Sequence, residues 1–216
     1  MHSPKAYIKL AIFGADGVTT GLKTVATALE KDFGTKPEAL AAFYEGPFQE
    51  VLFGKADLKA TLSPFLKDWS WTGTVEAFLA YWFRAEEGVN KTVIEEIRTL
   101  RERGIKCYLA MNKEKYHSEY LREKMGFKSI FNGIFSSADL GAKKPEKIFF
   151  ERLLKRIDPK RKIQHREILF WDDSAPAVKA ARDMGIQAYL YTDPDAFEET
   201  MSQVLIASQR FLKPRK

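Results

Sequence analysis

Four polar residues that follow apolar runs have side chains suited to chemistry. They are Asp16, Asn112 and the pair Asp172 and Asp173. Carboxylates transfer protons and, as oxygen ligands, bind hard cations such as Mg²⁺. Taken alone, Asp16 fits a turn, Asn112 a helix cap, and the acidic pair a solvated surface or a helix N-cap. The position of the acidic pair directly after an apolar run favours a metal site or the remnant of one, because sites in parallel sheets form at strand ends.

Short apolar runs predict the strands that would position these residues. Strands of a parallel sheet are covered on both faces and therefore read as continuous apolar stretches. We expect such strands over residues 7–13, 106–110, 168–171 and 188–191. Apolar residues at three-to-four spacing predict helices near residues 93–100, 148–157 and 177–184. This alternation indicates a doubly wound, Rossmann-like α/β sheet, whose sites form at the carboxyl ends of its strands.

One long segment interrupts the alternation. Residues 21–88 have a helical pattern and are rich in aromatic residues. We therefore predict a core domain of residues 1–20 and 89–216, with an inserted small all-helical cap domain of residues 21–88. We expect most of the aromatic side chains to form the interior of the cap or its contact with the core.

Composition limits the remaining classes of protein. The chain has 216 residues, of which 45% are hydrophobic and 30% charged, which suits one sizeable core and a small accessory domain. No stretch approaches the roughly 18 apolar residues of a membrane span, so we expect a cytoplasmic protein. Cys107 lies in an apolar run and fits a buried thiol. The net charge of +6 comes without a nucleic-acid-binding signature, which favours a solvated basic face over nucleic-acid binding. His117 and His165 have no partner at ligand spacing, and we assign both to the surface.

Four short motifs resemble those of the haloacid dehalogenase-like (HAD) hydrolase superfamily. Residues 13–18 (FGADGV) are similar to its first motif, Asp-x-Asp-Gly-[Val/Thr/Ile], and residues 109–112 (LAMN) to its second, [Ser/Thr]-Asn. Residues 141–149 (GAKKPEKIF) are similar to the third motif and residues 170–174 (FWDDS) to the fourth. The motifs come in the family's order, each at a predicted strand end or helix start, and span nearly all of residues 7–192. The resemblance implies the HAD fold.

The resemblance also implies roles for the carboxylates. In the family, the first aspartate of the first motif attacks phosphorus or a halogenated carbon and becomes covalently attached. The second aspartate, which Asp16 matches, protonates the leaving group and later activates water. Asp172 and Asp173 match the carboxylates that hold Mg²⁺, with Asp16 contributing through its backbone or side chain.

The remaining motif positions concern phosphate binding and the nucleophile. Lys144 matches the lysine that neutralises phosphoryl oxygens and is preferred to Lys143 because it directly precedes the proline. Asn112 matches the asparagine of the second motif, which would position the phosphate or its loop. Two positions depart from the pattern. Met111 stands where a phosphate-binding hydroxyl is expected and has no donor, and Gly14 stands where the nucleophile is expected and has no side chain.

These departures leave three hypotheses for function. The favoured one is a HAD-like phosphatase relative that acts on or binds a small phosphorylated or anionic metabolite, with catalysis impaired or lost and Mg²⁺ binding weakened by the missing carboxylate. The second is an active hydrolase in which Asp16 is the base for direct attack by water. The third is a non-enzymatic interaction protein with a protein partner. An otherwise intact site would leave a hole beside Gly14 that accepts a small carboxylate such as formate.

Overall fold

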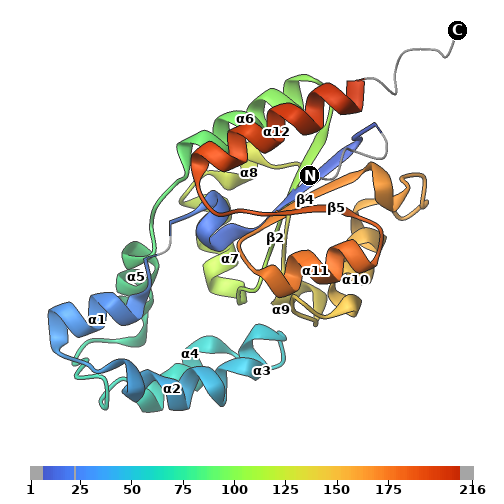
Figure 1. The fold of residues 1–216 in the computed structure, drawn as a ribbon. Helices are drawn as coiled ribbons and strands as arrows, with labels where there is room; N and C mark the ends of the chain where they lie inside the picture. Colours follow the sequence, from blue (N-terminus) through green and yellow to red (C-terminus); the bar gives the residue numbers. More distant parts are fainter. Residues whose placement is uncertain (1–6, 22, 210–216) are drawn as a thin grey trace, which may run out of the picture.

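A five-stranded parallel sheet forms the centre of the computed structural model, which describes residues 7–21 and 23–209 (Figure 1). The strand order is β3-β2-β1-β4-β5, and every neighbouring pair is parallel. The strands are β1 (Leu10–Phe13), β2 (Lys106–Met111), β3 (Gly133–Ser136), β4 (Ile168–Asp172) and β5 (Gln187–Leu190). Helices cover both faces of the sheet, so the fold is a Rossmann-like α/β fold, as the sequence predicts.

Four of the strands were predicted and one was not. The apolar runs correctly indicate β1, β2, β4 and β5, with ends that differ by a few residues. The missed strand, β3, has four residues at the edge of the sheet, and its side chains alternate between partly exposed and buried. A strand this short, with a partly exposed face, has no continuous apolar run to reveal it.

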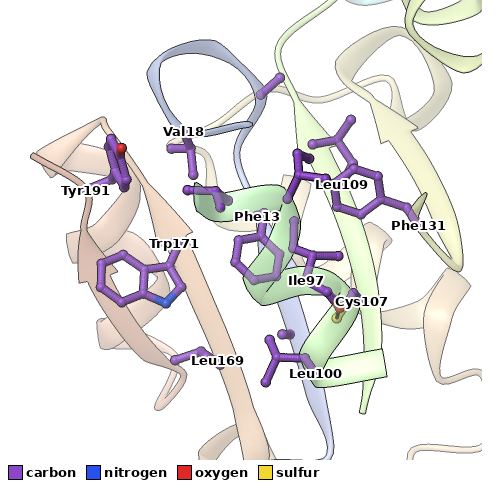
Figure 2. Close-up of a cluster of buried hydrophobic side chains, with 14 of the residues drawn as sticks. Phe13, Val18, Ile97, Leu100, Cys107, Leu109, Phe131, Leu169, Trp171 and Tyr191 are labelled. Carbon is purple, nitrogen blue, oxygen red and sulfur yellow. Dashed lines mark hydrogen bonds between the residues drawn. The ribbon is translucent and has the colours of Figure 1, made fainter. Parts of the chain in front are cut away.

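The two faces of the sheet carry separate apolar clusters, because side chains alternate along each strand. Phe13, Leu109 and Trp171 belong to a cluster with α6 (Lys91–Glu102), α8 (Phe127–Ile130) and α12 (Pro194–Gln209). Figure 2 shows the centre of this cluster, with Cys107 among its members. Cys107 is buried, as expected, and burial raises the pKa of its thiol to about 12.

The opposite face packs against a second set of helices. These are α9 (Ser137–Leu140), α10 (Lys147–Ile157) and α11 (Ala175–Asp183), which lie together on one side of the sheet (Figure 1). α7 (Lys115–Glu123) follows β2. The short segment η1 (Ala15–Thr19) follows β1, and the short segment η3 (His165–Glu167) directly precedes β4. The predicted helices near residues 93–100, 148–157 and 177–184 are therefore present as α6, α10 and α11.

Residues 23–88, which we term the inserted helical unit, lie between η1 and α6. The unit contains α1 (Val25–Phe33), α2 (Pro37–Glu45), α3 (Phe48–Leu52), α4 (Leu58–Leu62), η2 (Ser63–Phe65) and α5 (Val75–Ala85). It has an apolar cluster of its own, in which Phe43, Trp69 and Phe78 are fully buried. Most of its aromatic side chains thus stabilise the unit's interior.

The segments that enter and leave the inserted helical unit lie side by side. Thr20 and Val89 form an antiparallel bridge, and the backbone N–H of Asn90 donates to the carbonyl of Thr19 at 3.1 Å. The unit is therefore attached to the core through a paired two-stranded connection. Across residues 7–21 and 23–209, no helix is both long and apolar enough to cross a membrane.

Candidate functional site

The candidate residues meet at the carboxyl edge of the sheet. Gly14 follows β1, Asn112 follows β2, and Asp172 is the last residue of β4. β1 lies between β2 and β4, so the three strand ends are adjacent. Parallel topology therefore brings together residues that are up to about 160 positions apart in the sequence.

Gly14 lies directly against the carboxylate of Asp172. The backbone N–H of Gly14 donates to the carbonyl of Trp171 at 2.8 Å, and its carbonyl accepts from Thr19 Oγ1 at 3.0 Å. A Cβ atom on residue 14 would lie 2.7 Å from Asp172 Oδ2 and 3.3 Å from its Cγ. The space expected beside Gly14 is therefore occupied by the Asp172 carboxylate in this structure, and formate binding there stays a prediction that would require Asp172 to shift.

Asp172 forms a nearly buried ion pair with Lys144. The Lys144 ammonium lies 2.5 Å from Asp172 Oδ2, and the side chains of Lys144 and Asp172 are 9% and 2% exposed. Lys144 Nζ also donates to the carbonyl of Ala110 at 3.0 Å, and the backbone N–H of Ser174 donates to Asp172 Oδ1 at 3.0 Å. Both charges are thus compensated within the protein, as buried charges must be.

Asn112 holds the backbone of Lys144 in place. Its side-chain amide donates to the Lys144 carbonyl at 2.9 Å, and its Oδ1 accepts from the Lys144 N–H at 2.8 Å. Lys143 points elsewhere, since its ammonium donates to Gln49 Oε1 of the inserted helical unit at 2.6 Å. Lys144 is therefore the lysine that faces Asp172, and Asn112 orients it.

Met111 and Asp173, two further residues of the motifs, differ in exposure. Met111 is 1% exposed and packs in the apolar cluster on the α6 side of the sheet, so it offers no surface to a phosphate group. Asp173 is exposed, and its pKa is raised by partial desolvation and by the negative charge of Asp172. Asp172 and Asp173 thus occupy different environments despite being adjacent.

Asp16 belongs to a separate ion-pair network, Asp16–Lys113–Glu86, that reaches the inserted helical unit. Lys113 Nζ lies 3.0 Å from Asp16 Oδ1 and 3.1 Å from Glu86 Oε2. Burial alone would lower the pKa of Lys113, but the carboxylates of Asp16 and Glu86 outweigh it and raise that pKa. Lys113 therefore stays protonated between two carboxylates, one from each part of the chain.

His117 is buried beside this ion-pair network, which corrects its assignment to the surface. Its Nδ1 lies 3.6 Å from Glu86 Oε2, and its ring packs on Phe83 with centroids 4.6 Å apart. Burial, reinforced by the positive charge of Lys113, lowers the pKa of His117 well below its usual range. His117 is therefore neutral near pH 7, and its contact with Glu86 is a contact between a neutral ring and a carboxylate. His165 is exposed, as expected.

Comparison with known proteins identifies the family. Residues 8–185 match the haloacid dehalogenase-like hydrolase family. The chain belongs to this family. A sesquiterpene phosphatase of Aspergillus oryzae is 34% identical over 97 residues, which are 45% of this chain and 47% of that protein. A drimenol cyclase of Aspergillus calidoustus is 25% identical over 114 residues, which are 53% of this chain and 21% of that protein. The matched part of the chain thus spans half or less of these relatives.

A solved HAD family enzyme from Bacteroides thetaiotaomicron has the same fold. It superposes with a TM-score of 0.74 at 16% identity, covering 90% of this chain and 98% of that one. The same enzyme has been solved in complex with magnesium and inorganic phosphate, with a TM-score of 0.70 at 18% identity, covering 86% of this chain and 94% of that one. Identities this low establish the HAD fold alone.

The described residues do not fit Mg²⁺ as they are arranged in this HAD-like chain. Mg²⁺ needs several oxygen ligands in near-octahedral geometry. Gly14 provides no carboxylate, Asp172 is paired with Lys144, and Asp16 is paired with Lys113. Among residues 7–21 and 23–209, no three carboxylate, imidazole or thiolate side chains lie together closely enough to hold a metal ion. In this arrangement lysine side chains supply the positive charge around these carboxylates.

Sequence reasoning missed Lys113, Glu86 and His117. Lys113 directly follows Asn112 at the end of a predicted strand, and that position was a usable signal. Glu86 and His117 had no such signal, because their contact depends on how the inserted helical unit packs against α7.

Proposed function

We propose that this HAD-like chain binds a small phosphorylated or anionic metabolite and hydrolyses it slowly or not at all. The observation that carries the proposal is the contact between Gly14 and Asp172. The resemblance of the first motif places the nucleophile at residue 14, and the carboxylate of Asp172 fills the space that its side chain would need. A nucleophile that is absent cannot form the covalent intermediate on which the family's reaction depends.

No neighbouring carboxylate is arranged to replace the missing nucleophile. Asp172 is nearly buried, and both of its oxygens accept hydrogen bonds, from Lys144 and from the N–H of Ser174. Such a carboxylate is shielded from an incoming phosphate group. Asp16 is about half exposed and pairs with Lys113, which suits proton transfer better than covalent attack.

An anionic ligand at the sheet edge would have to share two lysines with the carboxylates that already pair with them. Lys113 and Lys144 both lie there, and lysine binds phosphate as a compact positive charge. A phosphatase of Aspergillus oryzae among the relatives, and the complex of the Bacteroides enzyme with inorganic phosphate, agree with a phosphate ester. We further propose that the inserted helical unit acts as a cap over this edge. We also propose that Mg²⁺ binds only weakly, because Asp172 would first have to give up its contact with Lys144.

A binding and turnover assay tests this proposal. Calorimetric titration with inorganic phosphate and a panel of phosphomonoesters, including a prenyl monophosphate, is expected to show binding. Hydrolysis of the same panel is expected to stay near the level without protein. Phosphate release at ordinary enzyme rates that Asp16→Asn abolishes would instead support the hydrolase in which Asp16 activates water. A chain that binds no anion would contradict the proposal.

A further inference from the structure

Lys113 contacts one carboxylate of the core, Asp16, and one carboxylate of the inserted helical unit, Glu86. We propose that Lys113 is a positioning residue that couples Asp16, in the segment after β1, to the inserted helical unit through Glu86. The proposal concerns the linkage between these parts and holds whether or not the chain turns over a phosphate ester.

The core side of this linkage is a contact with an accessible carboxylate. Lys113 follows β2 and Asn112, so its backbone is fixed at the carboxyl edge of the sheet. Its side chain is 15% exposed, whereas that of Asp16, 3.0 Å away, is 54% exposed. Asp16 is therefore the member of the ion-pair network that solvent or a ligand reaches most readily.

The other side of the linkage is anchored at the junction of the inserted helical unit. Glu86 directly follows α5, and its Oε2 lies 3.1 Å from Lys113 Nζ. Its Oε1 accepts from Trp82 Nε1 at 2.8 Å and from the backbone N–H of Val25 at 3.3 Å. Val25 begins α1. Glu86 thus connects the first and the last helix of the unit to Lys113.

The surroundings make the linkage sensitive to charge. Glu86 is 13% exposed, and the neighbouring ring of His117 is buried and neutral. Lys113 is therefore the cation that both carboxylates share in a poorly solvated environment, where electrostatic interactions are stronger than in water. Loss of the charge on Asp16, or its engagement by a ligand, should move Lys113 toward Glu86 and change the hydrogen bond from Trp82.

The tryptophan indole N–H groups provide a direct readout. The chain has four tryptophans, and each indole N–H has a different acceptor. Trp82 donates to Glu86, whereas Trp69 and Trp71 donate to backbone carbonyls within the inserted helical unit. In a ¹H–¹⁵N correlation spectrum, the Trp82 indole signal should follow Lys113, and the signals of Trp69 and Trp71 report whether the unit stays folded.

The experiment compares Asp16→Asn with Asp173→Asn, a nearby exposed carboxylate that does not contact Lys113. Asp16→Asn is expected to shift the Trp82 indole signal more than any other indole signal, and Asp173→Asn is expected to leave it in place. In a Lys113→Met background, Asp16→Asn should no longer shift the Trp82 signal, whereas in Lys113→Arg, which keeps the charge, the response should persist.

Three results would overturn the coupling. One is an unmoved Trp82 signal in Asp16→Asn, and another is an equal shift in Asp173→Asn, which would indicate a general field effect. The third is a response to Asp16→Asn that survives in Lys113→Met. Should Lys113→Met fail to fold, the first two comparisons still decide, because both substitutions are made at exposed positions of the unchanged chain.

Discussion

The carboxylate of Asp172 occupies the space beside Gly14, with Oδ2 2.7 Å from the point where a Cβ atom of residue 14 would lie. The same oxygen lies 2.5 Å from the ammonium of Lys144. A side chain at position 14 therefore requires the Asp172 carboxylate to shift, and the oxygen that must shift is the one that contacts Lys144. The sequence motifs indicate one missing carboxylate at position 14, and in the structure the Asp172 carboxylate lies directly beside that position.

Gly14→Ala tests this packing directly. The added methyl group must displace the Asp172 carboxylate, so we expect the free energy of unfolding to fall by about 1–3 kcal/mol, as for other overpacked sites. Urea denaturation measures the change. Gly21→Ala is the control, because a Cβ there meets nothing closer than 4.0 Å, and its effect should stay within about 0.5 kcal/mol. Equal stability of the two variants would show that Asp172 moves away from residue 14 at no cost.

Lys144→Met should be far more damaging than Lys143→Met. The first substitution leaves Asp172 buried without its counter-ion, which costs about 3–5 kcal/mol when one partner of a buried pair is removed. The second removes a partly exposed contact with Gln49, worth about 1 kcal/mol or less. The two lysines are adjacent, so a comparison of their urea midpoints separates the buried pair from any general effect of losing a lysine. Similar midpoints would contradict a buried pair.

The buried His117 should make the protein sensitive to acid. Its pKa in the folded state lies well below that of the unfolded chain, because burial and Lys113 disfavour the charged ring. The unfolded state therefore binds more protons below the usual pKa of histidine, and stability should fall with decreasing pH by up to about 1.4 kcal/mol per pH unit. Because the carboxyl of Glu114 titrates over the same range with the opposite sign, the His117 contribution is the difference between two proteins: from about pH 7 to about pH 5, His117→Gln should lose less stability, or gain more, than the unchanged chain. An unchanged slope would mean that His117 is protonated in the folded protein.

Glu114 should act in the opposite direction. Burial raises the pKa of this carboxyl to about 7, although it accepts hydrogen bonds from the N–H groups of Tyr116 and His117 at the start of α7. Between its ordinary pKa of 4.5 and about 7, the folded state binds more protons than the unfolded state. The contribution of Glu114 to the free energy of unfolding is therefore fully present below about pH 4.5. It decreases by about 3 kcal/mol in total as the pH rises through about 7. Glu114→Gln should lose less stability than the unchanged chain over that range, and a larger loss would contradict the assignment.

Particular elements show what the sequence could predict. Continuous apolar runs predicted β1, β2, β4 and β5, because burial on both faces leaves a clear signal. β3 was missed because its side chains are only alternately buried. The order of the four motifs placed Asp172 near Gly14, since strand ends of a parallel sheet meet at one edge.

Side-chain arrangement at the site was harder to predict. The Asp172 carboxylate occupies the space beside Gly14 and contacts Lys144, and the sequence does not fix the rotamer that places it there. Lys113, Glu86 and His117 were missed because tertiary packing of the inserted helical unit brings them together. Local patterns describe elements well, but contacts between distant segments depend on how those elements dock.

Phosphate release from a panel of small phosphomonoesters in the presence of Mg²⁺ tests the central claim most directly. The assay compares the unchanged chain with Gly14→Asp, and Gly14→Ala serves as a control that adds bulk without a carboxylate. We predict that the unchanged chain and Gly14→Ala release no phosphate above background, and that activity, where it appears, appears only in Gly14→Asp. Turnover by the unchanged chain at ordinary enzyme rates of about 1–10³ per second would contradict the account, because Gly14 would then not be the cause of impaired catalysis.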